Sequence, residues 1–154
     1  MSPSGISEHP ERALVRRAIE QKLTNLLVTT NPLAVSLNMH IREARDGWVR
    51  IAFSPPEGFT QGNGVVQGGI ISAMLDFGMI FAAFSMVPAD ATVATVSQTT
   101  NYFRPVFLGE LIVEAELEKS GRTLINARAS LFSADKSLLA SATAPIAVIA
   151  ARKT

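Results

Sequence analysis

The chain has 154 residues, of which 47% are apolar and 18% charged, and its net charge at pH 7 is +1. This length predicts one ordinary domain with a sizeable core, and the near-neutral charge provides no field to recruit nucleic acid. The sequence contains no cysteine, which excludes a disulfide scaffold, a cysteine nucleophile and a cysteine-based zinc site. Charged residues usually make up about 25% of a globular chain, so the low fraction suggests that another subunit covers part of the surface.

The N-terminal part of the chain predicts an arm, a helix and a strand. Residues 1–10 contain two prolines and one glycine and lack the apolar core of a secretory signal, so we expect a loose arm. Residues 11–28 place apolar side chains at helical spacing, which predicts an amphipathic helix that Asn31-Pro32 ends. From Leu33 to Arg42 the apolar residues alternate, as in a strand with one buried face.

A hairpin, a long loop and a series of strands make up most of the remainder. Asp46-Gly47 is typical of a tight turn before a returning strand at 48–53. Residues 55–67, with two prolines and three glycines, predict a long loop. The last third predicts strands joined by short turns, and therefore antiparallel, over 93–103, 111–119, 123–133 and 138–151.

The longest apolar stretch runs from Ile70 to Val87 and carries Asp76 near its middle. In a bilayer this carboxylate would cost about 2.5–3.5 kcal/mol, and no basic cluster flanks the stretch. We therefore expect a buried central helix that begins near Gly68 and stops before Pro88, in a cytoplasmic protein without a membrane span. One curved antiparallel sheet must then enfold this helix, which defines an α+β domain.

Two features of the helix could carry chemistry. The pair Gly68-Gly69 at its start lets a ligand approach the backbone, and free N–H groups there favour an oxygen that bears negative charge, as in an oxyanion hole for acyl transfer. The structural alternative is a tight turn that packs against the sheet. Asp76 is either a general base or nucleophile or a buried carboxylate satisfied by Ser, Thr or backbone partners.

The spacing of these residues resembles that of a known family. Gln61, Gly68 and Asp76 are separated by seven and eight residues, within the pattern Gly-x(3)-Gly-Gly-x(6)-Asp. With the later segments TVSQTTNYFRP, Gly109-Glu110 and Ser-Gly-Arg, the pattern resembles the hotdog-fold acyl-CoA thioesterases of the phenylacetate-degradation (PaaI-like) group. The resemblance covers about residues 33–150. It implies a hotdog domain at 33–154, preceded by an arm and an extra helix at 1–32.

The resemblance also implies roles for individual residues. Asp76 matches the catalytic carboxylate, which activates water or attacks the thioester carbonyl, and Gly68 matches the glycine whose N–H polarises that carbonyl. Gln61 matches a group that positions the nucleophilic water or the carbonyl, and Thr95 matches one that orients water. Contacts with the substrate or its coenzyme A are implied for Gln67, Gly69, Asn63, Arg104, Gly121 and Arg122. The sequence departs from the family at Gln67, where most relatives have histidine, and at Phe77, where some have Thr or Asn.

We therefore expect an acyl- or aryl-acyl-CoA thioesterase that needs no metal or cofactor, since coenzyme A is part of the substrate. Gly68 and Asp76 lie eight residues apart, or about 12 Å along a helix, so one helix cannot bring both to one carbonyl. This predicts a site shared across a two-fold axis in a homodimer, within a dimer of dimers. Two alternatives stay open: a hotdog dehydratase or hydratase, although residues 55–87 contain no histidine, and a non-catalytic acyl-CoA binder, which the departures at Gln67 and Phe77 would allow.

Overall fold

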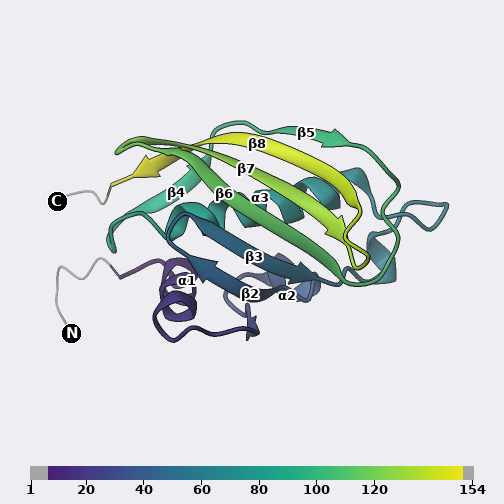
Figure 1. The fold of residues 1–154 in the computed structure, drawn as a ribbon, viewed down its shortest axis with the longest axis horizontal. Helices are drawn as coiled ribbons and strands as arrows, with labels where there is room; N and C mark the ends of the chain where they lie inside the picture. Colours follow the sequence, from purple (N-terminus) through teal and green to yellow (C-terminus); the bar gives the residue numbers. More distant parts are fainter. Residues whose placement is uncertain (1–6, 151–154) are drawn as a thin grey trace.

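The computed structural model describes residues 7–150, in which one antiparallel sheet curves around a central helix, α3 (Figure 1). The strand order is β1-β2-β3-β6-β7-β8-β4, and β5 also pairs with β8. The helices are α1 Pro10–Glu20, α2 Pro32–Ser36 and α3 Gly68–Phe84, with a short 3-10 helix at Glu57–Phe59. The strands are β1 Leu26–Leu27, β2 His40–Arg45, β3 Trp48–Phe53, β4 Thr92–Thr95, β5 Thr99–Tyr102, β6 Leu111–Ser120, β7 Leu124–Ser133 and β8 Leu138–Ile149. The expected α+β arrangement is confirmed.

Helix α3 lies at the centre of the core because its sequence is apolar on nearly every face. Met74 and Met79 are fully buried between the helix and the sheet, and burial of such a side chain contributes about 1.5–3 kcal/mol. Gly78 allows α3 to approach β6 closely, since a Cβ at this position would lie 2.6 Å from a methyl carbon of Val113. Among the described residues, no helix is long and apolar enough to cross a membrane.

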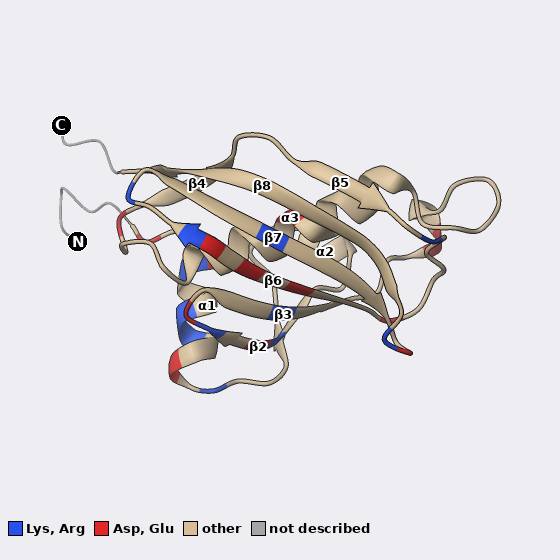
Figure 2. Ribbon diagram, turned by 45° about the horizontal axis from the view of Figure 1, so that its top comes forward, with Lys and Arg blue, Asp and Glu red and all other residues tan. Residues whose placement is uncertain are grey.

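The long strands β6, β7 and β8 alternate between a buried inner face and an outer face, which carries charged residues on β6 and β7. Inner residues such as Ala129 are buried against α3. On the outer face Arg50 lies 3.1 Å from Glu114, and Arg128 pairs with Glu116. Figure 2 shows the acidic positions along β6 beside a basic position on β7. These ion pairs are partly exposed, so each contributes little to stability.

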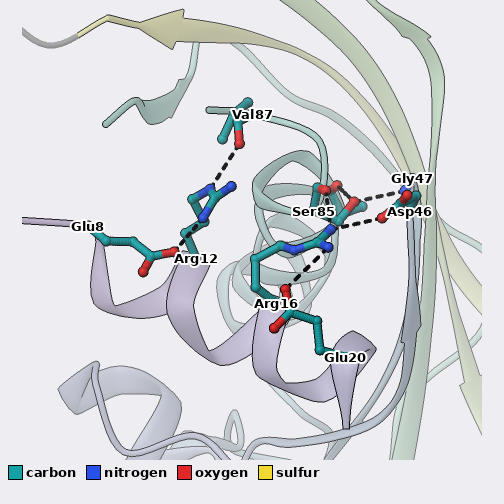
Figure 3. A network of polar contacts seen from close by, with 9 residues as sticks. Glu8, Arg12, Arg16, Glu20, Asp46, Gly47, Ser85 and Val87 are labelled. Atoms are coloured by element: carbon teal, nitrogen blue, oxygen red, sulfur yellow. Dashed lines mark hydrogen bonds and ion pairs between the residues drawn. The ribbon is translucent and has the colours of Figure 1, made fainter. Parts of the chain in front are cut away.

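Helix α1 packs on the C-terminal end of α3 and on the β2–β3 hairpin through two arginines (Figure 3). Arg12 donates a hydrogen bond to the carbonyl of Val87 at 2.9 Å. Arg16 donates to the carbonyl of Ser85 at 3.2 Å and to Asp46 at 2.9 Å. Carbonyls at a helix C-terminus lack partners and carry partial negative charge, so these cations stabilise the end of α3.

The N-terminal helix is shorter than the sequence predicted. It ends at Glu20 rather than near residue 28, because Lys22 adopts a left-handed conformation with φ +52°. The N–H of Leu23 then reaches back to the carbonyl of Ala18 at 3.0 Å, which is a Schellman-type helix end. The sequence concealed this end because lysine occupies the position where glycine is usual.

The predicted strand at 33–42 is also wrong in its first half. Asn31 accepts hydrogen bonds from the N–H groups of Leu33 and Ala34, and Pro32 stands in the first turn of α2. Asparagine at the N-cap followed by proline is a helix start, so Asn31-Pro32 begins a helix instead of ending one. Strand β2 begins only at His40.

One further boundary differs, at the N-terminal end of α1. His9, expected in the loose arm, is the N-cap of α1 and accepts a hydrogen bond from the N–H of Glu11 at 3.1 Å. Residues 1–6 of that arm lie outside the described residues, as does Ala151 at the expected end of the last strand.

The edge of the sheet beyond β8 is interrupted, whereas the sequence predicted one strand over 93–103. Strands β4 and β5 both pair with β8, and residues 96–98 between them belong to neither strand, although the N–H of Val96 still donates to the carbonyl of Pro145 at 2.9 Å. The predicted Asp46-Gly47 hairpin turn is confirmed, and Gly47 has φ +78°. The break at 96–98 matters for the site because it lets the chain turn toward α3.

Candidate functional site

The N-terminal end of α3 presents two backbone N–H groups to solvent. Gln67 is the N-cap, but its side chain makes no capping hydrogen bond. Among residues 7–150, the N–H groups of Gly68 and Gly69 have no hydrogen-bond partner, whereas those of Ile70 and Ile71 bond to the carbonyl of Gln67. Open amides at the positive end of a helix dipole favour a negatively charged oxygen.

A groove of about 610 Å³ opens onto these amides. Gly68, Gly69 and Ile71 form one wall, and the segment 102–106, which begins at the last residue of β5, forms the other. A Cβ added at Gly69 would meet no atom within 4 Å, so a side chain at this position would extend into open space. The structure brings together five residues predicted from the sequence, since the groove is lined by Gln61, Asn63, Gly68, Gly69 and Arg104.

Asp76 and Thr95 form a second cluster on the side of α3 that faces β4. The hydroxyl of Thr95 donates a hydrogen bond to Asp76 Oδ1 at 2.6 Å, and both residues are half-buried. Within the described part of the chain, Asp76 Oδ2 receives no hydrogen bond. The contact fits both interpretations of Asp76, because the carboxylate has a threonine partner and also keeps one oxygen able to accept a proton.

The two clusters lie apart within one chain. Gly68 and Asp76 occupy the same side of α3, two turns from one another, which corresponds to about 12 Å along the helix axis. The groove at Gly68 does not include Asp76 or Thr95 among its lining residues. A single copy of the chain therefore holds the open amides and the carboxylate at separate places.

Sequence reasoning missed four polar residues that lie between the clusters. Ser72, Gln98, Thr100 and Tyr102 are joined by side-chain hydrogen bonds that connect α3 to β5. The signal was present in the sequence, because Ser72 and Asp76 are the only polar side chains of α3. Ser72 is spaced four residues from both Gly68 and Asp76, and this spacing places all three on one helix face.

The remaining predicted residues do not reach the groove. Gln67 is exposed and is absent from its lining. Gly121 and Arg122 line a different pocket, of about 350 Å³, together with Val87 and Pro88 beyond the C-terminal end of α3. Within residues 7–150, no three His, Asp or Glu side chains are grouped so that they could hold a metal ion.

Comparisons with known proteins identify the family. The family model of the thioesterase superfamily matches residues 63–140, and the chain belongs to this superfamily. A thioesterase family protein from Silicibacter pomeroyi has 26% sequence identity and a TM-score of 0.76, over 91% of this chain and 98% of its own. This similarity confirms the hotdog fold.

Two other solved structures are similar. A phenylacetic acid degradation-related protein from Ralstonia eutropha has 26% identity and a TM-score of 0.76, over 87% of this chain and 98% of its own. A thioesterase from Haemophilus influenzae has 19% identity and a TM-score of 0.75, over 80% of this chain and 87% of its own. At this identity the similarity supports the fold alone. No curated protein sequence matches this chain.

Proposed function

We propose that the protein is an acyl-CoA thioesterase of the PaaI-like group. The observation that carries this proposal is the groove that opens onto the free N–H groups of Gly68 and Gly69. Membership of the thioesterase superfamily supports the reaction class. The similarity to the Ralstonia phenylacetic acid degradation-related protein supports the group and an aryl-acyl substrate. The chemistry belongs to residues 33–154, with residues 1–32 as a supporting segment.

Gly68 and Asp76 have different roles in thioester hydrolysis: Gly68 polarises the carbonyl and Asp76 is the base. The thioester oxygen accepts a hydrogen bond from the N–H of Gly68, which stabilises the negative charge that develops there. Thr95 occupies Asp76 Oδ1, so Oδ2 accepts a proton from water, and the resulting hydroxide attacks the carbonyl carbon. The tetrahedral intermediate breaks its C–S bond, coenzyme A leaves as the thiolate, and the proton on Asp76 returns to the sulfur. In this scheme Gln61 positions the attacking water.

The substrate contacts that we propose lie at both ends of α3. Gly69, Asn63 and Arg104 line the groove, while Gln67 lies beside it as the N-cap of α3. Gly121 and Arg122 lie at the opposite end of the helix. If two copies place their α3 helices antiparallel across a two-fold axis, the partner's Asp76 comes beside Gly68, and the partner's Arg122 approaches the groove and the phosphates of coenzyme A. The separation of Gly68 and Asp76 by about 12 Å along the helix axis supports such a shared site.

Asp76→Asn tests the carboxylate. The change is nearly isosteric, keeps a hydrogen-bonding group beside Thr95 and removes the base, so turnover should fall about 100-fold or more while the fold persists. The assay is thiol release from a panel of aliphatic and aryl-acyl-CoA thioesters, with enoyl-CoA hydration measured in parallel. Glu20→Gln, at an exposed position of α1, is the matched control and should retain full activity. Near-native turnover of Asp76→Asn, or binding of acyl-CoA by the parent protein without turnover, would contradict the proposal.

Subunit mixing tests the shared site. Gly69→Leu should fold, because a Cβ there meets no atom within 4 Å, and its side chain should block the groove. Mixed dimers of Gly69→Leu and Asp76→Asn subunits should regain one working site, although each variant alone is inactive. If mixed dimers form, as shown by mass spectrometry of tagged subunits, and no activity returns, each chain must build its own site.

A further inference from the structure

The two polar side chains of α3 both bond to the segment that contains β4 and β5. Asp76 meets Thr95, and Ser72 Oγ lies 2.6 Å from the hydroxyl of Tyr102 and 3.2 Å from Thr100 Oγ1. Gln98, in the break between the strands, donates to Thr100 Oγ1 at 3.0 Å. We refer to Ser72, Gln98, Thr100 and Tyr102 as the polar seam. It fills the helix face between Gly68 and Asp76.

The polar seam also bonds to the backbone of α3. The hydroxyl of Tyr102 donates to the carbonyl of Gly68 at 3.1 Å, and Gln98 Nε2 donates to the carbonyl of Ser72 at 3.0 Å. In an α-helix these two carbonyls also accept from the N–H groups of Ser72 and Asp76, four residues later. The seam therefore attaches directly to the helical turns that carry the open amide and the carboxylate.

Strand β5 depends on this attachment. It is four residues long and pairs only with β8 among the described strands, so its other edge is free. Tyr102, its last residue, begins the groove wall at 102–106, while Gly68 and Gly69 form the opposite wall. The ring of Tyr102 also lies 3.6 Å from the place of a Cβ on Gly68. The seam thus sets the separation of the two walls.

We propose that the polar seam is a positioning element for thioester hydrolysis. It holds the N–H of Gly68 and the facing groove wall in place, and it does not contact the reacting atoms. This inference rests on the proposed thioesterase function. Because a misplacement of about 1 Å can cost about 100-fold in rate, loss of the seam should lower kcat and leave KM little changed.

Tyr102→Phe removes one hydroxyl and keeps the ring that packs beside Gly68. We expect kcat to fall about tenfold or more and KM to change by less than about threefold. Ser72→Ala should behave in the same way, and Ser72→Thr, which restores a hydroxyl, should recover most of the activity. Asn101→Ala is the matched control, because Asn101 is exposed on β5 and makes no side-chain hydrogen bond among the described residues; its kinetics should equal those of the parent.

Three kinetic results would overturn the inference. The first is a kcat for Tyr102→Phe within about twofold of the parent, and the second is an equal loss of kcat in Asn101→Ala. The third is a rise in the KM of Tyr102→Phe with no change in kcat, which would place the hydroxyl of Tyr102 on the substrate. Amide hydrogen exchange gives a readout that is independent of turnover. Tyr102→Phe and Ser72→Ala should exchange faster than Asn101→Ala across residues 68–76. If the parent hydrolyses no acyl-CoA, the proposed function fails, and unchanged exchange would then refute the seam as well.

Discussion

Addition of a single methyl group at Gly78 would test how closely α3 must approach the sheet. A Cβ at this position would lie 2.6 Å from Val113 Cγ1 and 3.2 Å from the Cβ of Ala115. Carbon atoms pack best at about 3.5–4.0 Å, so in Gly78→Ala the Val113 methyl group must retreat by about 1 Å. Val113 and Ala115 are both buried on the inner face of β6, which is paired with β3 on one side and β7 on the other.

Two opposing effects determine how much Gly78→Ala changes the free energy of unfolding. Alanine is favoured over glycine inside a helix by about 1 kcal/mol, whereas overpacking of a core costs about 1–3 kcal/mol. Val113 is β-branched with a stiff χ1 angle and belongs to a strand paired on both sides, so we expect the upper part of that range. The net loss in free energy of unfolding should be about 1–2 kcal/mol, equivalent to a fall in Tm of about 2–8 °C.

Urea and thermal unfolding at one fixed protein concentration would measure this loss, since oligomerisation makes stability depend on concentration. Gly69→Ala is the control within the same helix, and it should be neutral or stabilising because its Cβ meets no atom within 4 Å. Val113→Ala is then made in the parent and in Gly78→Ala. Its loss in free energy of unfolding should be at least about 1 kcal/mol smaller in Gly78→Ala than in the parent. A more stable Gly78→Ala, or additive losses in this cycle, would refute the close contact.

Three other changes test local features. Asn31 caps α2 and donates to the buried carboxylate of Glu11 at 3.1 Å. Asn31→Asp keeps the cap but places two carboxylates opposite one another, so the free energy of unfolding measured at pH 7 should fall. Lys22→Gly should raise Tm by about 1–4 °C, because glycine adopts the left-handed conformation without strain, and a lower Tm would contradict this. Hydrogen bonds from Ser133 and then Ser137 lower the pKa of Asp135 below its usual value, so their stabilising effect is present above the unfolded-state pKa and is lost as the pH falls through the folded-state value. In Ser133→Ala the NMR titration midpoint of Asp135 should move upward, and an unchanged midpoint would be the contrary result.

The long, regular elements of this fold could be predicted from the sequence. Helix α3 and strands β6 to β8 have extended patterns that only one secondary structure satisfies. The N-terminal region could not be predicted in the same way, because its signals are short. Leu33 and Val35 alternate as in a strand, but Asn31 supplies a helix cap, and local capping decided the outcome. The end of α1 at Lys22 was hidden because a left-handed lysine carries no sequence signature.

The candidate site could also be predicted from the sequence only in part. The resemblance assigned Asp76 and Thr95 to one catalytic site without predicting a contact between them, and the structure joins them by a hydrogen bond. The grouping of Gln61 with Arg104 depends on how the loop and the end of β5 fold over α3, which spacing along the chain does not reveal. Arg122 illustrates the limit of such reasoning, since its pocket lies at the opposite end of α3 in a single chain.

The interrupted edge of the sheet also bears on how the protein behaves at high concentration. Long, uninterrupted edge strands are templates for open-ended strand addition and aggregation. Here β4 and β5 offer two segments of four residues with a break between them, and at the opposite edge the two residues of β1 cover only His40 and Ile41 of β2. Such short edges can accept one partner of matching shape but do not favour growth of a fibril. The break at 96–98 that brings Gln98 to α3 thereby also shortens the edge that self-templated strand addition would need.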